Sequence, residues 1–158
     1  KEGRVRKVVC SFPRQVDSWV FDELYRAGKI ELELVPQGDL AERIRAAGAG
    51  IPAFYSPTGY GTRLAEGAET REFDGVNTVM KTALSAEVAL VKAHRADTWG
   101  NLVYRKTARN FGPVMVTAAT TSIVQVEHIL PVGSLDPETV VSPGIFVDRL
   151  VEIPGGGQ

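Results

Sequence analysis

The sequence has a single cysteine, Cys10, among its 158 residues. One thiol cannot form an internal disulfide, and its place in the apolar run 8–10 favours a small buried hydrophobe over a nucleophile. The two histidines, His94 and His128, are far apart in the sequence, and there is no cysteine pair. The usual ligand spacing of a metal site is therefore missing, and we expect no bound metal.

An excess of charge of one sign is also missing. Eighteen Lys and Arg residues balance nineteen Asp and Glu residues, for a net charge of −1 and a pI of about 6.2. Nucleic-acid binders normally show a basic surplus. No apolar run approaches the roughly 18 residues that cross a bilayer, and no secretory signal opens the chain. We expect neither nucleic acid nor membrane as a partner, and the cytoplasm as the compartment.

Common catalytic fingerprints are lacking too. There is no phosphate-binding G-x-G-x-x-G or P-loop motif and no G-x-S-x-G nucleophile elbow. No residue stands out as a nucleophile, so the reactive group is expected outside this sequence. The length suits one domain over residues 1–158. The chain has no initiator Met and enters a strand at once, which predicts that a preceding segment is missing, and the glycines at 155–157 predict a frayed tail.

Hydrophobic periodicity predicts an alternation of strands and helices. The predicted strands are 5–11, 30–35, 86–93, 102–104, 122–127 and 145–153, and the predicted helices are 16–27, 40–47 and 114–120. Gly28 should end the first helix, and Pro113 should lie in the first turn of the last. The near-continuous apolar run at 86–93 predicts a strand buried on both faces of a parallel sheet. The fold class is α/β, a mostly parallel sheet with flanking helices, and the charged stretch 63–76 is an exposed excursion.

The most informative stretch follows the strand at 29–35, in which apolar and charged residues alternate as on a strand with one solvated face. A proline ends that strand, and Gly38 is expected to allow the backbone conformation of the turn that follows. Asp39 with Glu42 predicts a capping box at the start of the next helix. Gln37 then lies at the carboxyl end of a strand and before a helix N-terminus, where ligands bind in open α/β sheets. The alternative is that Gln37 satisfies the backbone of its own loop.

A second unusual stretch is the loop predicted at 48–62. It holds four glycines and two prolines, so its backbone can approach a ligand closely. It also carries more hydroxyl and aromatic groups than a solvent loop needs, which predicts a loop that lines a site. These groups belong to Phe54, Tyr55, Ser56, Thr58, Tyr60 and Thr62.

These residues carry a resemblance. The stretches 34–46, 48–61 and 100–111 resemble the A subunit of family I CoA-transferases, over almost the whole chain. The early stretches 5–15 and 21–31 are more similar to the 3-oxoadipate branch of the family, which acts in aromatic catabolism, than to the acetoacetate branch. The resemblance implies the CoA-transferase domain, which is isomerase-like in fold.

The resemblance also implies an activity. CoA would move from succinyl-CoA to 3-oxoadipate through a glutamyl-CoA intermediate, with the glutamate on a B subunit in a heterodimer or heterotetramer. No cofactor would be bound permanently, because the CoA thioester is a substrate. A Gly-Gly-Phe motif and an Asn-Asn pair of the family are absent, which agrees with a missing preceding segment, and the end of the chain at Gln158 favours a separate B chain. The alternatives are an acetoacetate- or butyrate-type transferase and a non-catalytic sugar-phosphate-binding domain.

By the same resemblance, Gln37 would orient the partner's glutamate and stabilise charge on the carbonyl oxygen. The wall facing the acyl group and the pantetheine arm would be formed by Gly38, Phe54, Ser56, Thr58 and Gly59.

The sequence allows more than one role for each of three arginines. Succinate and 3-oxoadipate each carry a second carboxylate, and Arg14 is the candidate to bind it, unless it is a solvated loop arginine. Arg105 and Arg109, four residues apart if helical, could bind CoA phosphates or form structural salt bridges, and the salt bridge is the favoured interpretation.

Overall fold

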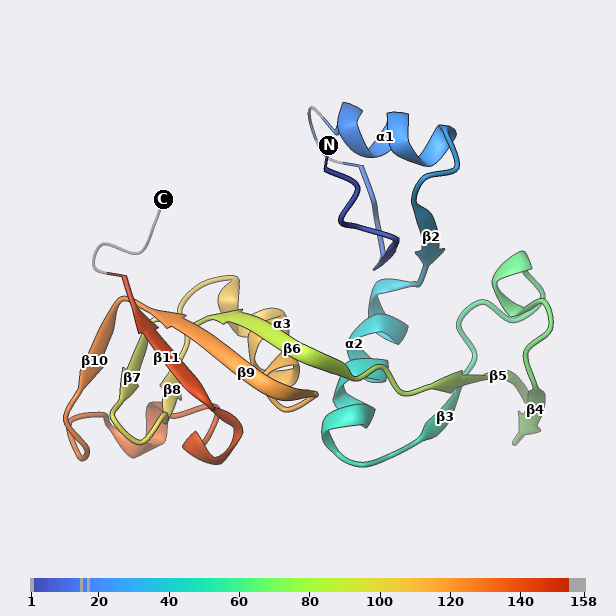
Figure 1. The fold of residues 1–158 in the computed structure, drawn as a ribbon. Helices are drawn as coiled ribbons and strands as arrows, with labels where there is room; N and C mark the ends of the chain where they lie inside the picture. The colour runs from blue at the N-terminus through green and yellow to red at the C-terminus, as the bar shows by residue number, and fades with distance from the viewer. Residues whose placement is uncertain (1, 15, 17, 154–158) are drawn as a thin grey trace. The chain divides into compact units, whose positions relative to one another are not determined.

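A computed structural model describes residues 2–14, 16 and 18–153 of the chain (Figure 1). The predicted glycine tail at 155–157 lies outside the described residues. None of the helices in these ranges combines the length and apolar character that crossing a membrane requires. The helices are α1 (Trp19–Arg26), α2 (Gln37–Gly48) and α3 (Ala108–Met115). The strands are β1 (Lys7–Cys10), β2 (Glu31–Leu34), β3 (Ala53–Ser56), β4 (Thr70–Phe73), β5 (Val76–Thr82), β6 (Ala86–Lys92), β7 (Arg95–Asp97), β8 (Leu102–Val103), β9 (Ala119–Val126), β10 (His128–Leu130) and β11 (Arg149–Glu152).

The contacts within the chain divide it into two compact units. The first unit comprises residues 1–42 and 53–82, and the second comprises residues 43–52 and 83–158. The first turn of α2 belongs to the first unit and its C-terminal part to the second. The expectation of a single domain stays a prediction.

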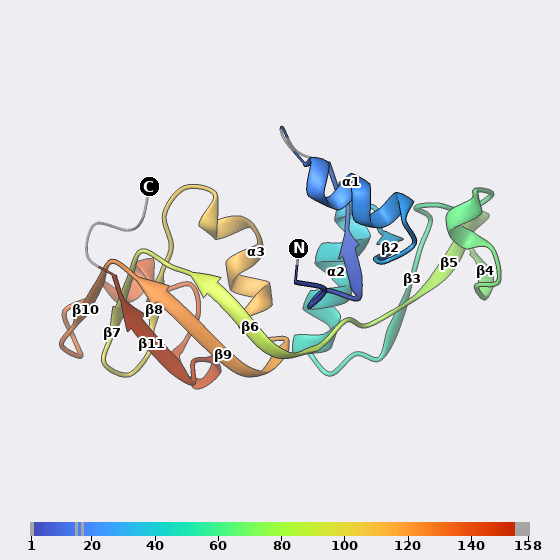
Figure 2. The ribbon, with the colours of Figure 1, turned by 45° about the horizontal axis from the view of Figure 1, so that its top comes forward.

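In the first unit, β1 and β2 form a parallel pair connected by α1, as the order of the sequence pattern predicts (Figure 2). Gly28 ends α1 as expected, with φ of +66°. Its N–H donates to the carbonyl of Tyr25 at 3.0 Å, and the N–H of Lys29 donates to the carbonyl of Leu24 at 2.9 Å. These two bonds form a Schellman cap, whose left-handed residue is normally glycine.

The alternation predicted for β2 is only partly observed. Leu34 is 45% exposed, and Glu33 is half-buried. Glu33 lies 2.6 Å from the ammonium of Lys7 on β1, so a charged pair occupies the place expected for a fully solvated side chain.

The first unit also contains an antiparallel sheet of order β3-β5-β4, which the sequence pattern did not predict. The loop expected at 48–62 is therefore interrupted by β3, and the charged excursion at 63–76 contains β4 and the start of β5. The excursion is nevertheless exposed, as predicted.

The second unit is built on a parallel sheet of order β11-β9-β6, with α3 packed against β6 (Figure 1). This sheet confirms the predicted α/β class with parallel strands. Its core includes alternate residues of β6 and β9, packed around Leu102 and Val116. These buried sheet residues are Ala89, Val91, Val124 and Val126.

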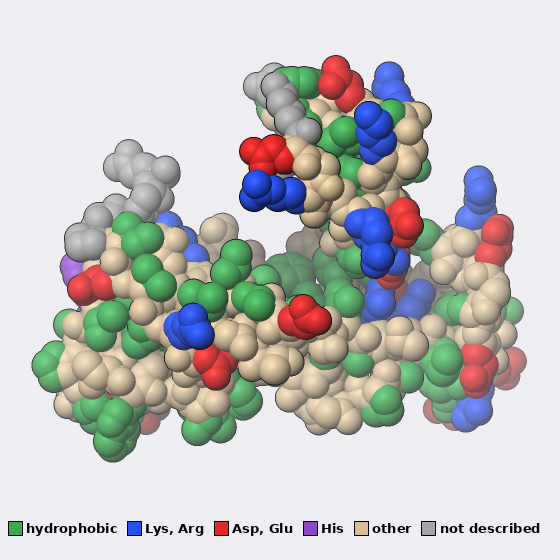
Figure 3. Space-filling view, in the orientation of Figure 1, with side chains coloured by type: hydrophobic (Ala, Val, Ile, Leu, Met, Phe, Trp, Pro, Cys, Tyr) green, Lys and Arg blue, Asp and Glu red, His purple; other side chains and the backbone are tan. Residues whose placement is uncertain are grey.

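The prediction that β6 is buried on both faces is wrong for the described chain. Leu90 is 73% exposed and Val88 is 51% exposed, while Ala89 and Val91 are buried. Figure 3 shows hydrophobic side chains at the surface over β6, β9 and β11. The periodicity of an apolar run cannot reveal whether anything covers its second face.

Helix α3 begins earlier than predicted. It spans Ala108–Met115, and Pro113 lies inside it instead of in the first turn. Its first turn is tightened by bonds from Arg109 and Asn110 to carbonyls three residues back, at 3.2 and 3.0 Å. The strand predicted at 145–153 is shorter than expected, because only β11 (Arg149–Glu152) is a strand there.

Asp97 organises the turn before residue 102. Asp97 is 3% exposed, and its Oδ1 accepts the N–H groups of Trp99 and Asn101, both at 3.0 Å. Its Oδ2 accepts the side-chain amide of Asn101 at 2.7 Å. The turn connects β7 and β8, which pair antiparallel.

Candidate functional site

Gln37 is the first residue of α2, directly after the segment that leaves β2. The N–H of Leu40 donates to the carbonyl of Pro36 at 2.9 Å, so the helix begins immediately behind the proline. The side chain of Gln37 is exposed and makes no hydrogen bond to the described residues. The predicted position after the end of the strand is confirmed, but Gln37 is the first residue of the helix and does not precede it. Its amide is available to donate and to accept.

The details of this turn differ from the prediction. Gly38 lies within α2 and has no positive φ, so it does not free a turn. Asp39 is in the first helical turn and is not the N-cap residue, because the helix starts two residues before it. Its buried carboxylate makes tertiary contacts instead, and an acidic group there also suits the helix dipole.

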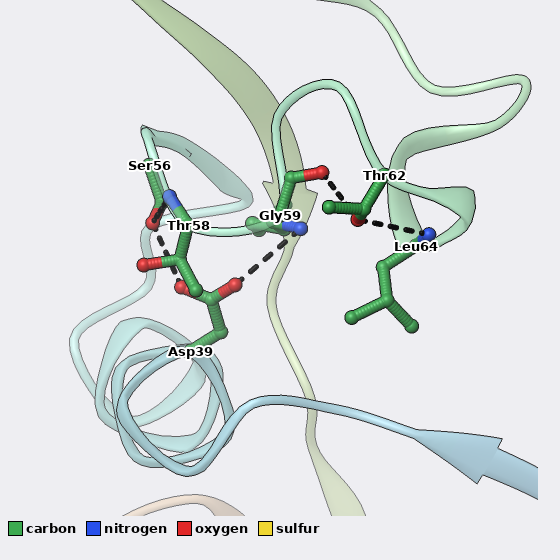
Figure 4. A network of polar contacts seen from close by, with 7 residues as sticks. Asp39, Ser56, Thr58, Gly59, Thr62 and Leu64 are labelled. Carbon is green, nitrogen blue, oxygen red and sulfur yellow. Dashed lines mark hydrogen bonds and ion pairs between the residues drawn. The ribbon is translucent and has the colours of Figure 1, made fainter.

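Asp39 joins three elements at one point (Figure 4). Its Oδ1 accepts the hydroxyl of Ser56, at the end of β3, at 2.8 Å. Its Oδ2 lies 3.4 Å from Nζ of Lys81 on β5. Sequence reasoning missed Lys81, because nothing in the stretch around it matches a motif.

The residues assigned to the acyl-group wall form one strand-and-turn segment of the first unit. Phe54 and Ser56 are half-buried residues of β3, and the N–H of Thr58 donates to Oγ of Ser56 at 3.2 Å. Gly59 has φ of +86°, and its carbonyl accepts the hydroxyl of Thr62 at 2.7 Å (Figure 4). The structure thus brings Ser56 and Thr58 to the first turn of α2 that carries Gln37, through Asp39.

The aromatic Tyr55 is directed into other contacts. Its ring packs edge-on against Phe73 with centroids 5.3 Å apart, and the guanidinium of Arg71 lies 5.2 Å from its centroid. Its hydroxyl donates to Glu69, and this hydrogen bond raises the pKa of Tyr55. Tyr55 is therefore part of the sheet packing.

Arg14 has a partner on α1. Its Nε lies 3.3 Å from Oδ1 of Asp22, and 62% of the Arg14 side chain is exposed. This geometry corresponds to an ordinary surface ion pair, which contributes little to stability.

Arg105 and Arg109 do not share a helix, because Arg105 precedes α3. Arg105 lies 3.6 Å from Glu127, which also lies 3.6 Å from Nε2 of His94. Burial lowers the pKa of His94, the nearby Arg105 lowers it further, and Glu127 opposes them. The contact of Arg105 is the structural salt bridge that the sequence favoured.

No group of three possible metal ligands (His, Cys, Asp or Glu) is close enough to hold an ion within 2–14, 16 and 18–153. The polar groups around the first turn of α2 are an exposed amide on Gln37, the hydroxyl of Ser56 and the charged pair of Asp39 and Lys81.

Solved structures define the class of fold. An acyl-CoA transferase of Escherichia coli O157:H7 superimposes with a TM-score of 0.84 and 23% identity, over 100% of this chain and 34% of that chain. Glutaconate coenzyme A-transferase of Acidaminococcus fermentans gives a TM-score of 0.81 and 21% identity, over 97% of this chain and 56% of that one. The fold is that of CoA-transferases.

The sequence is more specific. Residues 1–153 match the Coenzyme A transferase family model, and the chain belongs to that family. It is 67% identical to the A subunit of 3-oxoadipate CoA-transferase from Pseudomonas putida, over 97% of this chain and 66% of that protein. It is 60% identical to the protein of the same name from Acinetobacter baylyi, over 97% of this chain and 67% of that protein. It is 57% identical to the A subunit of succinyl-CoA:3-ketoacid coenzyme A transferase from Xanthomonas campestris, over 94% of this chain and 60% of that protein.

The chain therefore spans about two thirds of the length of the curated relatives it matches.

Proposed function

We propose that the chain is part of the A subunit of a cytoplasmic CoA-transferase that moves CoA from succinyl-CoA to 3-oxoadipate in aromatic catabolism. The observation that carries the proposal is the 67% identity to the A subunit of a 3-oxoadipate CoA-transferase over 97% of the chain. The exposed Gln37 at the start of α2 supports it, because it leaves an amide free beside a structured wall.

The proposed reaction is a double displacement in which a glutamate of a B subunit is the nucleophile. Its carboxylate attacks the succinyl thioester carbonyl, the CoA thiolate leaves, and a mixed anhydride forms. The thiolate then attacks the glutamyl carbonyl of the anhydride, which yields glutamyl-CoA and releases succinate. The carboxylate of 3-oxoadipate attacks glutamyl-CoA, and the thiolate that leaves attacks the oxoadipyl carbonyl to give 3-oxoadipyl-CoA and free glutamate.

In this scheme Gln37 provides the amide that orients the glutamate and donates to the oxygen on which negative charge develops. A preformed donor in a site closed to water stabilises such charge strongly. Gly38, Phe54, Ser56, Thr58 and Gly59 form the wall that faces the acyl group and the pantetheine arm. No permanently bound cofactor is needed, since the CoA thioester is itself a substrate.

A second candidate is transfer to a 3-oxo acid without a second carboxylate, such as acetoacetate. The 57% identity to the A subunit of a succinyl-CoA:3-ketoacid transferase supports it. The mechanism and the role of Gln37 would be the same, and only the acceptor would differ.

The test is a transferase assay on the full-length A subunit, alone and mixed with its B subunit, with succinyl-CoA as donor. Activity only in the mixture, with a preference for 3-oxoadipate over acetoacetate, is expected. Preference for acetoacetate would select the second candidate. No transfer to either acceptor, from a mixture that assembles, would reject a transferase and favour a non-catalytic binding domain.

A further inference from the structure

Lys81 is a mostly buried cation among the residues assigned to the acyl-group wall. In the antiparallel pair of β3 and β5 its register partner is Phe54. A Cβ placed on Gly59 would lie 3.7 Å from Nζ of Lys81. Its side chain is 12% exposed, and that of its ion-pair partner Asp39 is 5% exposed. A charge in such a place interacts more strongly with a ligand than a solvated charge does.

The ion pair leaves this ammonium with donors to spare. Oδ1 of Asp39 is held by Ser56 at 2.8 Å, whereas Oδ2 has no hydrogen bond in the described part of the chain. Nζ of Lys81 is 3.4 Å from that Oδ2, and no hydrogen bond joins it to any described residue. A lysine ammonium carries three N–H donors, and buried charged groups are normally hydrogen-bonded. Lys81 can therefore contact a second carboxylate while Asp39 stays in place.

We propose that Lys81 binds the second carboxylate of a dicarboxylic acyl group and so determines acceptor specificity. This inference rests on the proposed function. Succinate and 3-oxoadipate both carry such a carboxylate, and acetoacetate does not. Asp39 holds the ammonium beside Gly59, and the ligand carboxylate completes its coordination with a charge-assisted hydrogen bond.

The competing cation is Arg14, which the sequence suggested for this role. Arg14 is 62% exposed and already faces the carboxylate of Asp22 at 3.3 Å. A solvated, paired guanidinium discriminates weakly between ligands. Lys81 is more buried and less completely coordinated, and its neighbours Phe54 and Gly59 belong to the proposed wall.

The experiment measures kcat/KM for 3-oxoadipate and for acetoacetate with the full-length protein assembled with its B subunit. Lys81→Met should lower the preference for 3-oxoadipate about ten- to a hundredfold, as expected for a lost hydrogen bond to a charged group. The loss should lie in KM for the dicarboxylate. Lys81→Arg should retain most of the preference, and Lys29→Met, which makes the same change at an exposed lysine, should leave both acceptors unchanged.

Two variants at Asp39 separate ligand binding from a structural role. Asp39→Asn keeps an oxygen for Ser56 and leaves Lys81 charged but less firmly held, so the preference for 3-oxoadipate should fall less than in Lys81→Met. Lys81→Met alone strands a buried carboxylate and can unfold the protein. The double variant Asp39→Asn with Lys81→Met removes both charges and should fold, yet show the same loss of preference.

Three results would overturn the inference. The first is an equal loss on both acceptors in the folded Lys81 variants. The second is the same loss of preference in Asp39→Asn as in Lys81→Met. The third is a loss of preference in Arg14→Ala with none in Lys81→Met. Inactivity of the unchanged assembly would instead reject the proposed function, so the two failures are distinguishable.

Discussion

Replacing Gln37 by alanine should leave the stability of the fold unchanged. Its side chain is exposed, makes no hydrogen bond to the described residues and stands at the first position of α2. Alanine is a good helix former and no packing is lost. The free energy of unfolding should therefore change by no more than about 0.5 kcal/mol, as for other surface substitutions.

The same variant should be severely impaired in catalysis. Loss of one preformed donor to a developing oxyanion typically costs about 100- to 1,000-fold in kcat, or about 2.7–4 kcal/mol. If Gln37 acts mainly in the transition state, KM for the CoA thioester should change little. The assay is steady-state kinetics on the assembled subunits, together with thermal unfolding of the same samples.

Gln37→Glu is a more specific test of the role of the amide. The new side chain has nearly the same shape as glutamine, but it places a carboxylate beside the proposed glutamate nucleophile. Two carboxylates at close range raise the pKa of one of them, so the nucleophile is protonated at a higher pH. Turnover should be low at neutral pH. An unchanged kcat in Gln37→Ala would refute the proposed role, and a fall in kcat that tracked a fall in melting temperature would show a structural one.

Three further predictions concern the second unit and α2. Leu90→Lys, at a side chain 73% exposed on the apolar sheet face, should change the free energy of unfolding in urea by no more than about 0.5 kcal/mol; a larger loss would contradict the exposed position of this side chain. Gly48→Ala places a Cβ 2.1 Å from Oγ1 of Thr117 and should lower the free energy of unfolding by about 1–3 kcal/mol in urea. Gly38→Ala, whose Cβ has nothing within 4 Å, should raise it by up to about 1 kcal/mol, and equal effects would count against the packing argument. Because burial lowers the pKa of His94 from 6.5, the unfolded chain binds this proton more readily; stability should fall as the pH drops below about 6.5, and His94→Gln should flatten that part of the curve.

Local signals in the sequence predicted the positions that matter most for the candidate site. Pro36 ends the segment after β2, and the following helix begins at Gln37. Gly28 adopts the left-handed conformation that its cap requires. Each of these outcomes depends on the backbone conformations that one residue type, proline or glycine, allows. The sequence alone is therefore enough to predict them.

Features that depend on tertiary contacts could not be predicted in this way. Strand β3 lies between two prolines, and only its pairing with β5 distinguishes it from a loop. Asp39 has the sequence context of a capping residue, yet its carboxylate contacts Ser56 and Lys81, which are distant in sequence. The exposed face of β6 at Leu90 has the same composition as a buried one.

The central claim is that this chain supplies an amide while its partner supplies the nucleophile. The most direct measurement is intact-mass spectrometry of both proteins after incubation with succinyl-CoA in the absence of an acceptor. A CoA adduct on the partner, formed only when both are present and discharged by adding 3-oxoadipate, is the predicted result. An adduct on this chain, or transfer of CoA that proceeds with no adduct on either protein, would contradict the account.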